Sequence, residues 1–219
     1  MKDAMKRGAV PLMILVAALC VGMTRAQAQQ PAAGGAPAGG ARGGGRGPVL
    51  SVSTTAFPDG GEVPMHNAGR GDNKSPAFEF HWMNGATAAT APDTVKSYTI
   101  VLHDIENSTA RGTGDTLHWT AFNIPGSAKG IPEGLASGDL PDGTINGPGI
   151  MAGRGGNPAG YFGPGAGPGP IHHYVFEFYA LDVKLDLTGA ATRDELMKAM
   201  EGHVVGKAAY VGRFHAPNP

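Results

Sequence analysis

The sequence predicts a mainly β protein, a sandwich of β-sheets with a few short peripheral helices. Glycine and proline are frequent, with 36 and 18 among the 219 residues, which favours many turns over long helices. Strands are expected where β-branched or aromatic residues are flanked by turn residues. Five segments fit this description: Val49–Phe57, Ser97–Leu102, Leu117–Ile124, Tyr174–Leu181 and Val204–Phe214. Many strands with few helices predict a β-sandwich or a related β-fold.

One helix is expected near the C-terminus. Thr192 and Glu195 form a capping box, in which each side chain satisfies a backbone N–H of the other residue. Leu196 and Met200 follow four residues apart, so they share one face of the helix. Gly202 ends the pattern, because glycine is common just past the end of a helix.

Residues 1–28 are predicted to be a cleavable signal peptide. Basic residues precede a short apolar run at residues 9–21, and Ala26–Ala28 forms an A-x-A cleavage signal. The run is too short to span a bilayer comfortably, so no transmembrane span is expected after processing. Cleavage after Ala28 predicts a periplasmic or secreted protein. Cys20 is the only cysteine, so the mature chain would have neither disulfides nor cysteine catalysis.

Two regions are expected after the signal peptide. Residues 29–48 are almost entirely glycine, alanine and proline, which predicts a disordered linker because such a segment has little apolar area to bury. Residues 49–219 have the length of one domain with one core. The formal net charge of the whole chain is −1 and aromatic residues make up 7%, so nothing indicates nucleic-acid binding.

A stiff loop leads into the strand predicted at residues 174–181. Residues 160–170 are rich in glycine and proline and cannot form a helix, because proline lacks a backbone donor and glycine allows unusual torsions. The following residues alternate between two sets of side chains, which is the period of a strand. The loop therefore delivers His172 and His173 to the beginning of a core strand.

These residues resemble a motif of the phosphatidylethanolamine-binding protein family, whose bacterial members are also called Raf-kinase-inhibitor-like proteins. The family pattern is a loop of the form G-P-x-P-P-x-G-x-H-R-Y, followed by an aromatic strand that ends in Y-A-L-D. Gly163–Pro164, His172, Tyr174 and Tyr179–Asp182 match this pattern. The loop of this chain is expanded by glycine, and His173 stands where the family usually has arginine.

Two further segments are similar to the same family. Asp104 matches the first aspartate of a D-P-D pattern, in which Ile105 and Glu106 replace the proline and the second aspartate. His118 begins a match to the family strand H-W-x-x-x-N-I-P. The resemblance therefore implies a compact β-sandwich with a ligand pocket at one end, where Asp104, His118 and His172 meet.

The resemblance implies that this pocket binds a small phosphate or a phospholipid headgroup. Asp104 is expected to orient an imidazole, because a carboxylate that accepts from one ring nitrogen fixes the tautomer and favours the charged ring. His118 and His172, when charged, are expected to donate to a phosphate oxygen. Backbone N–H groups of residues 163–169 are expected to form an anion-binding concavity.

The remaining ligand-binding candidates are Glu106, Gly163, Pro164, His173 and Tyr174. Tyr174 offers a hydroxyl donor, although its strand position equally permits a role in the core. The chain has no G-x-S-x-G nucleophile elbow, no P-loop and no H-E-x-x-H motif, so neither a catalytic residue nor a cofactor is predicted.

Three alternatives remain open from the sequence. One is an inhibitor or regulatory partner of an extracytoplasmic protein, such as a protease or a kinase, since the family is known for restraining such enzymes. Another is a hydrolase that uses the same acid and histidine cluster, with or without a metal. The last is a metal site, because zinc favours the ligand types found together here: His103, Asp104, Glu106, His118, His172 and His173.

Overall fold

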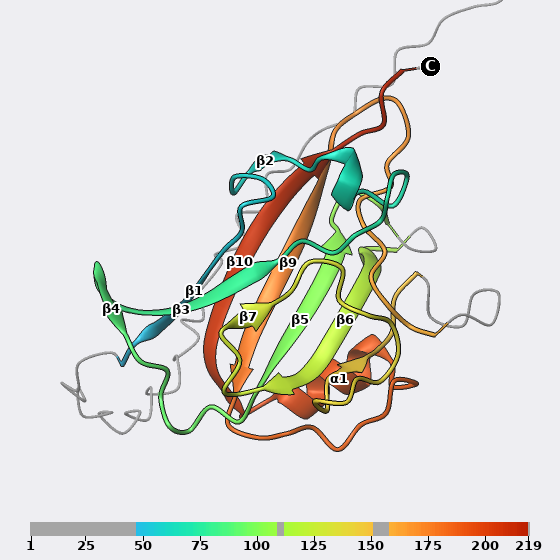
Figure 1. Ribbon diagram of the computed structural model, residues 1–219. Coiled ribbons are helices and arrows are strands. Elements are labelled where there is room, and N and C mark those ends of the chain that lie inside the picture. The colour runs from blue at the N-terminus through green and yellow to red at the C-terminus, as the bar shows by residue number, and fades with distance from the viewer. Residues whose placement is uncertain (1–46, 109–111, 151–157, 219) are drawn as a thin grey trace, which may run out of the picture. The chain divides into compact units, whose positions relative to one another are not determined.

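The computed structural model describes residues 47–108, 112–150 and 158–218 (Figure 1). The predicted signal peptide, residues 1–28, and nearly all of the predicted linker, residues 29–48, lie outside the described residues. Among the residues that are described, no helix has the length and apolar character needed to cross a membrane.

Two β-sheets make up the described fold. The smaller sheet has the order β1-β3-β4, and β7 also pairs with β3. Its strands are β1 (Val49–Ser53), β3 (Phe78–Asn84), β4 (Thr87–Ala89) and β7 (Gly130–Ile131). The larger sheet has the order β2-β10-β9-β5-β6-β8. Its strands are β2 (Gly61–Glu62), β10 (Val204–Phe214), β9 (His172–Leu181), β5 (Ser97–Asp104), β6 (Thr116–Pro125) and β8 (Ile145–Asn146).

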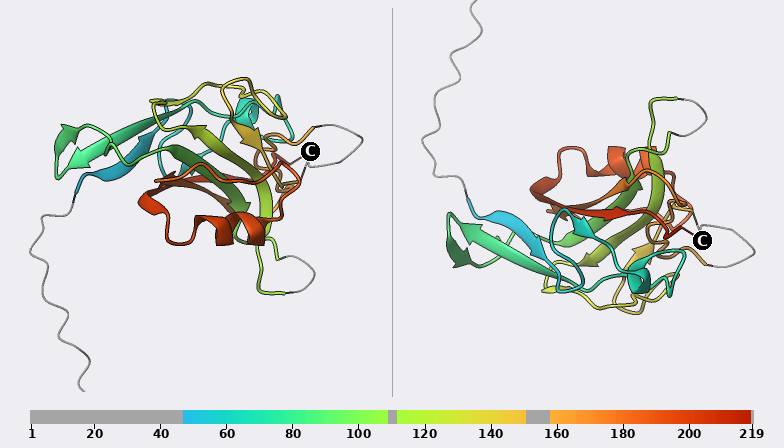
Figure 2. Two further views of the ribbon diagram at one scale, coloured as in Figure 1. Left: turned by 90° about the horizontal axis from the view of Figure 1, so that it is seen from below. Right: turned by 90° about the horizontal axis from the view of Figure 1, so that it is seen from above.

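The larger sheet is covered on both faces (Figure 2). Its inner face packs against the smaller sheet, and β9 supplies this core with Tyr174, Phe176 and Phe178, which are at most 1% exposed. Its outer face packs against α1 (Arg193–Met200) through Leu196 and Met200. The alternation expected for β9 is therefore present, and both sets of side chains are largely buried.

The mainly β fold predicted from the sequence is confirmed. The capping box of α1 is also present, since the Thr192 hydroxyl accepts from the Glu195 N–H at 3.2 Å and the Glu195 carboxylate accepts from the Thr192 N–H at 2.7 Å. In the described residues, the one other helix is the 3₁₀ turn η1 (Met65–Asn67). The first predicted strand was too long, because β1 ends at Ser53 and Phe57 packs into the core from the turn that follows.

Antiparallel pairing gathers three chain segments at the end of the larger sheet where β5 ends. β5 ends at Asp104, which pairs with Thr116 at the beginning of β6 and with Tyr174 near the beginning of β9. Neighbouring antiparallel strands run in opposite directions, so the end of one lies beside the beginnings of the two others. Segments more than 50 residues apart in the sequence therefore meet at this end of the sheet.

Candidate functional site

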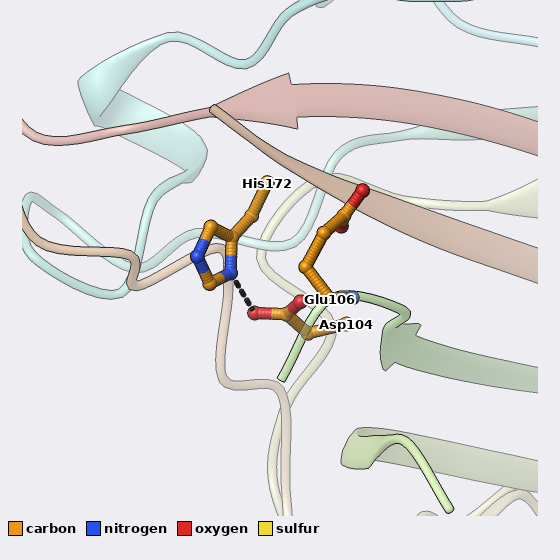
Figure 3. Close-up of side chains that lie close together, drawn as sticks. All are labelled: Asp104, Glu106 and His172. Atoms are coloured by element: carbon orange, nitrogen blue, oxygen red, sulfur yellow. Dashed lines mark hydrogen bonds and ion pairs between the residues drawn. The ribbon is translucent and has the colours of Figure 1, made fainter. Parts of the chain in front are cut away.

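A buried carboxylate holds an imidazole at the end of the sheet where β5 ends. Asp104 is 2% exposed, and its Oδ2 lies 2.8 Å from Nδ1 of His172 (Figure 3). The other oxygen, Oδ1, accepts from the backbone N–H groups of Glu106 and Asn107, both at 3.1 Å. A carboxylate only accepts, so the proton of this contact lies on Nδ1 of His172. The remaining ring nitrogen, Nε2, is then the one left for a ligand.

A β-bulge places His118 opposite this pair. Leu102 pairs with Trp119 while His103 pairs with Leu117, so His118 is an extra residue of β6 in the pairing with β5. A bulge breaks the alternation of side chains and can turn one of them toward the other face. Trp119 is buried in the core between the sheets. The ring centroids of His118 and Tyr174 lie 5.1 Å apart, with the two rings nearly perpendicular.

The His118 ring is fixed by the loop that precedes β9. Its Nδ1 lies 3.1 Å from the carbonyl oxygen of Phe162 and 3.2 Å from that of Gly163. Carbonyl oxygens only accept, so Nδ1 carries a proton and donates to them. Burial lowers the pKa of His118, and the two carbonyl oxygens and the Asp104 carboxylate offset this effect only in part. The neutral ring therefore presents a lone pair at Nε2.

Tyr174 also holds this loop, through its hydroxyl group. Its hydroxyl oxygen accepts from the N–H groups of Gly165 at 3.1 Å and Ala166 at 2.9 Å. The N–H of Gly163 donates to the side chain of Asn73 at 2.9 Å. These three N–H groups are bonded within the protein, so the anion concavity expected from residues 163–169 is not formed by them. Burial raises the pKa of Tyr174 to about 12, so its phenol stays neutral.

The outer side of the loop is held by residues 67–73, which were not predicted to belong to the site. The side chain of Asn73 donates to the carbonyl of Tyr161 at 3.1 Å, and Arg70 donates through Nε to the carbonyl of Gly165 at 2.7 Å. The Tyr161 hydroxyl donates to the carbonyl of Asn67 at 2.7 Å. Asn73 adopts a φ of 55°, a conformation that asparagine tolerates better than most residues. This preference was the available signal in the sequence.

These elements form a half-open pocket of about 270 Å³, called the site pocket below. Its walls are formed by Asp104, Asn107, His118, Ile150, Phe162, His172 and Tyr174, together with residues 165–167. Among the predicted site residues, the structure thus brings together Asp104, His118, His172 and Tyr174 around one pocket. Gly163 and Pro164 lie in the loop behind it, where Gly163 contacts His118 through its carbonyl oxygen.

Glu106 and His173 pair with each other outside the site pocket. Glu106 accepts from the backbone N–H of His173 and contacts its Nδ1, both at 2.7 Å. Their side chains are 36% and 43% exposed. Figure 3 shows the Glu106 carboxylate pointing away from the contact between Asp104 and His172. The structure therefore separates these two residues from the other candidates, because His173 follows His172 on a strand and points to the opposite face.

Three residues of the possible metal site lie close together, but two of them already have partners within the protein. Asp104, Glu106 and His172 offer ligand atoms that lie within 4.8 Å of one another. Glu106 is also held by His173, and Asp104 by two backbone N–H groups. A metal ion at this position would require Glu106 to release His173.

A larger hollow of about 450 Å³ lies at the edge formed by β2 and β10. Its walls are mainly apolar and include Ile171 and Phe214, with Arg213 and His215 as the basic residues. None of the predicted site residues lines it. The volume of this hollow alone does not make it the better candidate, since the ionisable groups with fixed partners gather at the site pocket.

Comparison with known proteins identifies the family. Residues 53–215 match the phosphatidylethanolamine-binding protein family. A UPF0098 protein of Methanothermobacter thermautotrophicus is 32% identical over 166 residues, which cover 75% of this chain and 98% of that protein. A Mycobacterium tuberculosis protein whose name describes it as a lipoprotein, LppC, is 32% identical over 168 residues, covering 75% of this chain and 72% of that protein.

Solved structures show the same fold. The crystal structure of the Chlamydia trachomatis homologue CT736 has a TM-score of 0.62 at 24% identity. That of Escherichia coli YbcL, described as a member of the mammalian family, has a TM-score of 0.61 at 19% identity. Each comparison covers 77% of this chain and 99% of the other. The sequence match and the shared fold together show that this chain belongs to the phosphatidylethanolamine-binding protein family.

Proposed function

We propose that this protein binds a small phosphate-bearing ligand, either free phosphate or a phospholipid headgroup, in the site pocket. The observation that carries the proposal is the pair formed by Asp104 and His172, whose imidazole keeps Nε2 available beside a half-open pocket. Family membership supports the same class of ligand. No catalytic step is part of the proposal.

Each residue of the pocket has a different role in binding. Asp104 fixes the His172 ring, and a charged His172 donates from Nε2 to an anionic oxygen. His118 forms the facing wall, and the loop of residues 163–167 closes the pocket above Tyr174. Charge-assisted hydrogen bonds of this kind are about twice as strong as neutral ones. The arrangement therefore suits an anion of few atoms.

An extracytoplasmic location is part of the proposal. It is supported by the A-x-A signal of the sequence and by the similarity to a protein named as a lipoprotein. An inhibitory role toward another protein would then concern partners in that compartment. No contact or surface of the described residues favours that role over ligand binding.

Isothermal titration calorimetry of the purified protein tests the proposal. Phosphate and phosphoethanolamine are titrated separately, with a chelator present, into the wild type and into His172→Ala. We expect at least one of the two anions to bind the wild type and binding to be lost in His172→Ala. The relative affinities of the two ligands show whether the headgroup amine contributes.

His203→Ala is the matched control. His203 contacts Asp182 with the same atoms, Nδ1 and a carboxylate oxygen, at the same distance of 2.8 Å, but it does not line the site pocket. Equal loss of binding in both variants would contradict the assignment to the site pocket. Binding of zinc without binding of either anion would replace the proposal with a metal site. Hydrolysis of a phosphate ester that is lost in His118→Ala would contradict the absence of a catalytic step.

A further inference from the structure

The two imidazoles of the site pocket differ in what they offer a ligand. Both rings use Nδ1 to donate to the protein, His172 to the Asp104 carboxylate and His118 to two backbone carbonyl oxygens. Nε2 is therefore the ligand-facing nitrogen of each ring. A charged ring donates from Nε2, whereas a neutral ring accepts there. The protonation state of each ring thus decides which ligand atom it can bind.

The surroundings of His118 favour its neutral form. The ring is 3% exposed, and burial lowers its pKa. The Asp104 carboxylate favours the charged ring, whereas the His103 imidazole, on the other face of the sheet, opposes it. Tyr174, whose own pKa is raised by burial, contacts the ring, and His172 lines the same pocket. Two carbonyl oxygens at Nδ1 are satisfied equally by the neutral ring. His118 therefore presents an acceptor at Nε2.

The charges that line the site pocket also disfavour a fully ionised ligand. Its lining, as far as the structure describes it, contains Asp104, His118 and His172 but no lysine or arginine. Arg70 contacts the closing loop through the carbonyl of Gly165 and is not among the lining residues. A fully ionised oxyanion would place one oxygen against the lone pair of His118 and add negative charge beside the buried Asp104. Like charges and facing acceptors both oppose that arrangement.

We propose that the site pocket selects oxyanions that carry a hydrogen-bond donor beside an anionic oxygen, above all phosphate groups that retain a proton. The P–O–H group donates to Nε2 of His118, while a charged oxygen accepts from Nε2 of His172. This inference rests on the proposed function and adds the protonation state to the ligand. It requires a charged His172, because the neutral ring would offer a second acceptor at Nε2 and no donor to the anionic oxygen.

Sulfate is the sharpest probe of this inference. It has the same tetrahedral shape as phosphate but carries no proton near neutral pH, whereas phosphate monoesters take up their last proton near pH ~6. A site that accepts a hydrogen bond from its ligand rejects an analogue that lacks the donor, often by large factors. We expect phosphate to bind at least about tenfold more tightly than sulfate at pH ~6.5 in calorimetry.

Two phosphodiesters separate the possible sources of the donor. The methyl phosphodiester of ethanolamine has no P–O–H group but carries an ammonium group, whereas dimethyl phosphate has no hydrogen-bond donor. Stronger binding of the ethanolamine compound would support the donor requirement and assign the donor to the headgroup amine. Equal binding of the two, at an affinity similar to that of phosphate, would overturn the requirement.

The variant His118→Gln is expected to abolish the proposed preference. Glutamine can turn its amide N–H toward the ligand, which replaces the acceptor of the neutral imidazole with a donor. We expect the ratio of phosphate affinity to sulfate affinity to fall toward one, with His203→Gln as the control that keeps the ratio of the wild type. Should the variant fail to fold, long-range ¹H–¹⁵N spectra of the wild type provide the second test. An Nε2 of His118 that is protonated when phosphate is bound contradicts the inference.

The outcomes distinguish this inference from the function on which it rests. Sulfate binding as tightly as phosphate, with both lost in His172→Ala, would leave the anion site intact and overturn the donor requirement. Failure of every anion to bind would overturn the proposed function itself. Preference for phosphate that disappears in His118→Gln would support both.

Discussion

Two histidine–carboxylate pairs originate from neighbouring residues of β5 and point to opposite faces of the larger sheet. Asp104 faces the site pocket and holds His172. His103 belongs to the outer face, where its Nδ1 lies 2.5 Å from Asp115 and its Nε2 lies 3.7 Å from Glu177. The residue types are the same in both pairs. The difference lies in what remains for a ligand, because Nδ1 of His103 contacts Asp115 and its Nε2 is buried near Glu177 without a hydrogen bond.

The outer pair belongs to a row of alternating charges. Asp115 also binds Arg193 of α1, and Glu177 binds Lys207 of β10 at 2.7 Å. His103 lies between the two carboxylates, so side chains of three neighbouring strands and the helix are connected. Both carboxylates of this network have basic partners within the protein, which is typical of a structural role. The sequence alone could not separate it from the site, since His103 precedes Asp104 directly.

The largest effect is expected from breaking the inner pair. In Asp104→Asn the side chain keeps its shape, but its NH₂ group must face either Nδ1 of His172 or the two backbone N–H groups, so one set of these hydrogen bonds is lost. Hydrogen bonds to buried charged groups contribute about 1.5–3 kcal/mol each, and we expect a loss of about 2–3 kcal/mol in the free energy of unfolding. Urea denaturation measures this loss, and calorimetry should show phosphate affinity reduced at least about tenfold. An unchanged phosphate affinity would show that Asp104 does not position the ligand-binding ring.

Breaking the outer pair is expected to cost stability without changing ligand binding. In His103→Gln the short contact with Asp115 is lost, but Asp115 keeps Arg193 as a partner. We expect a loss of about 1 kcal/mol in urea denaturation, the usual contribution of one hydrogen bond. Phosphate affinity should stay within roughly twofold of the wild type, since the side chain lies on the other face. A tenfold weaker affinity would mean that the two faces are coupled through β5.

Acid unfolding tests the role of Lys207 in the outer network. Burial by itself would raise the pKa of Glu177, but the hydrogen bond and charge of Lys207 outweigh it and the pKa is lowered overall. A carboxylate with a lowered pKa stabilises the fold above its unfolded pKa, and this contribution is lost as pH falls through the folded value. In Lys207→Met the folded pKa should rise, so circular dichroism should show unfolding at a higher pH than in the wild type. A midpoint at the same or a lower pH would contradict the role of Lys207.

The sequence predicted the main elements because their signals are local. β-branched and aromatic residues between turn residues identified β5, β6 and β10, alternation of side chains marked β9, and the Thr192 capping box identified α1. β3 was not predicted as a strand, although its aromatic residues Phe78 and Phe80 line the core. The convergence of Asp104, His118 and His172 came from the family resemblance and not from the periodicity of the strands.

The details that decide the chemistry are not local. The bulge at His118 is a property of the pairing between β5 and β6, so periodicity along β6 alone assigns this side chain to the other face. The loop N–H groups were expected to face a ligand, but Gly165 and Ala166 donate to the Tyr174 hydroxyl, whose position depends on the packing of β9. The contacts of Asn73 join segments about 90 residues apart, which no short pattern reveals.

The smallest effect is expected at the rim, where Glu106 and His173 replace the acidic and basic residues usual in the family. Both side chains are more than a third exposed, and exposed ion pairs contribute about 0–1 kcal/mol. Glu106→Gln retains one acceptor for the backbone N–H of His173, so we expect a loss below about 1 kcal/mol and a phosphate affinity within roughly twofold of the wild type. Parallel urea denaturation and calorimetry measure both. A strong loss of affinity would place Glu106 in contact with the ligand and return it to the set of binding residues, because neither the pair with His173 nor the fold can account for such a loss.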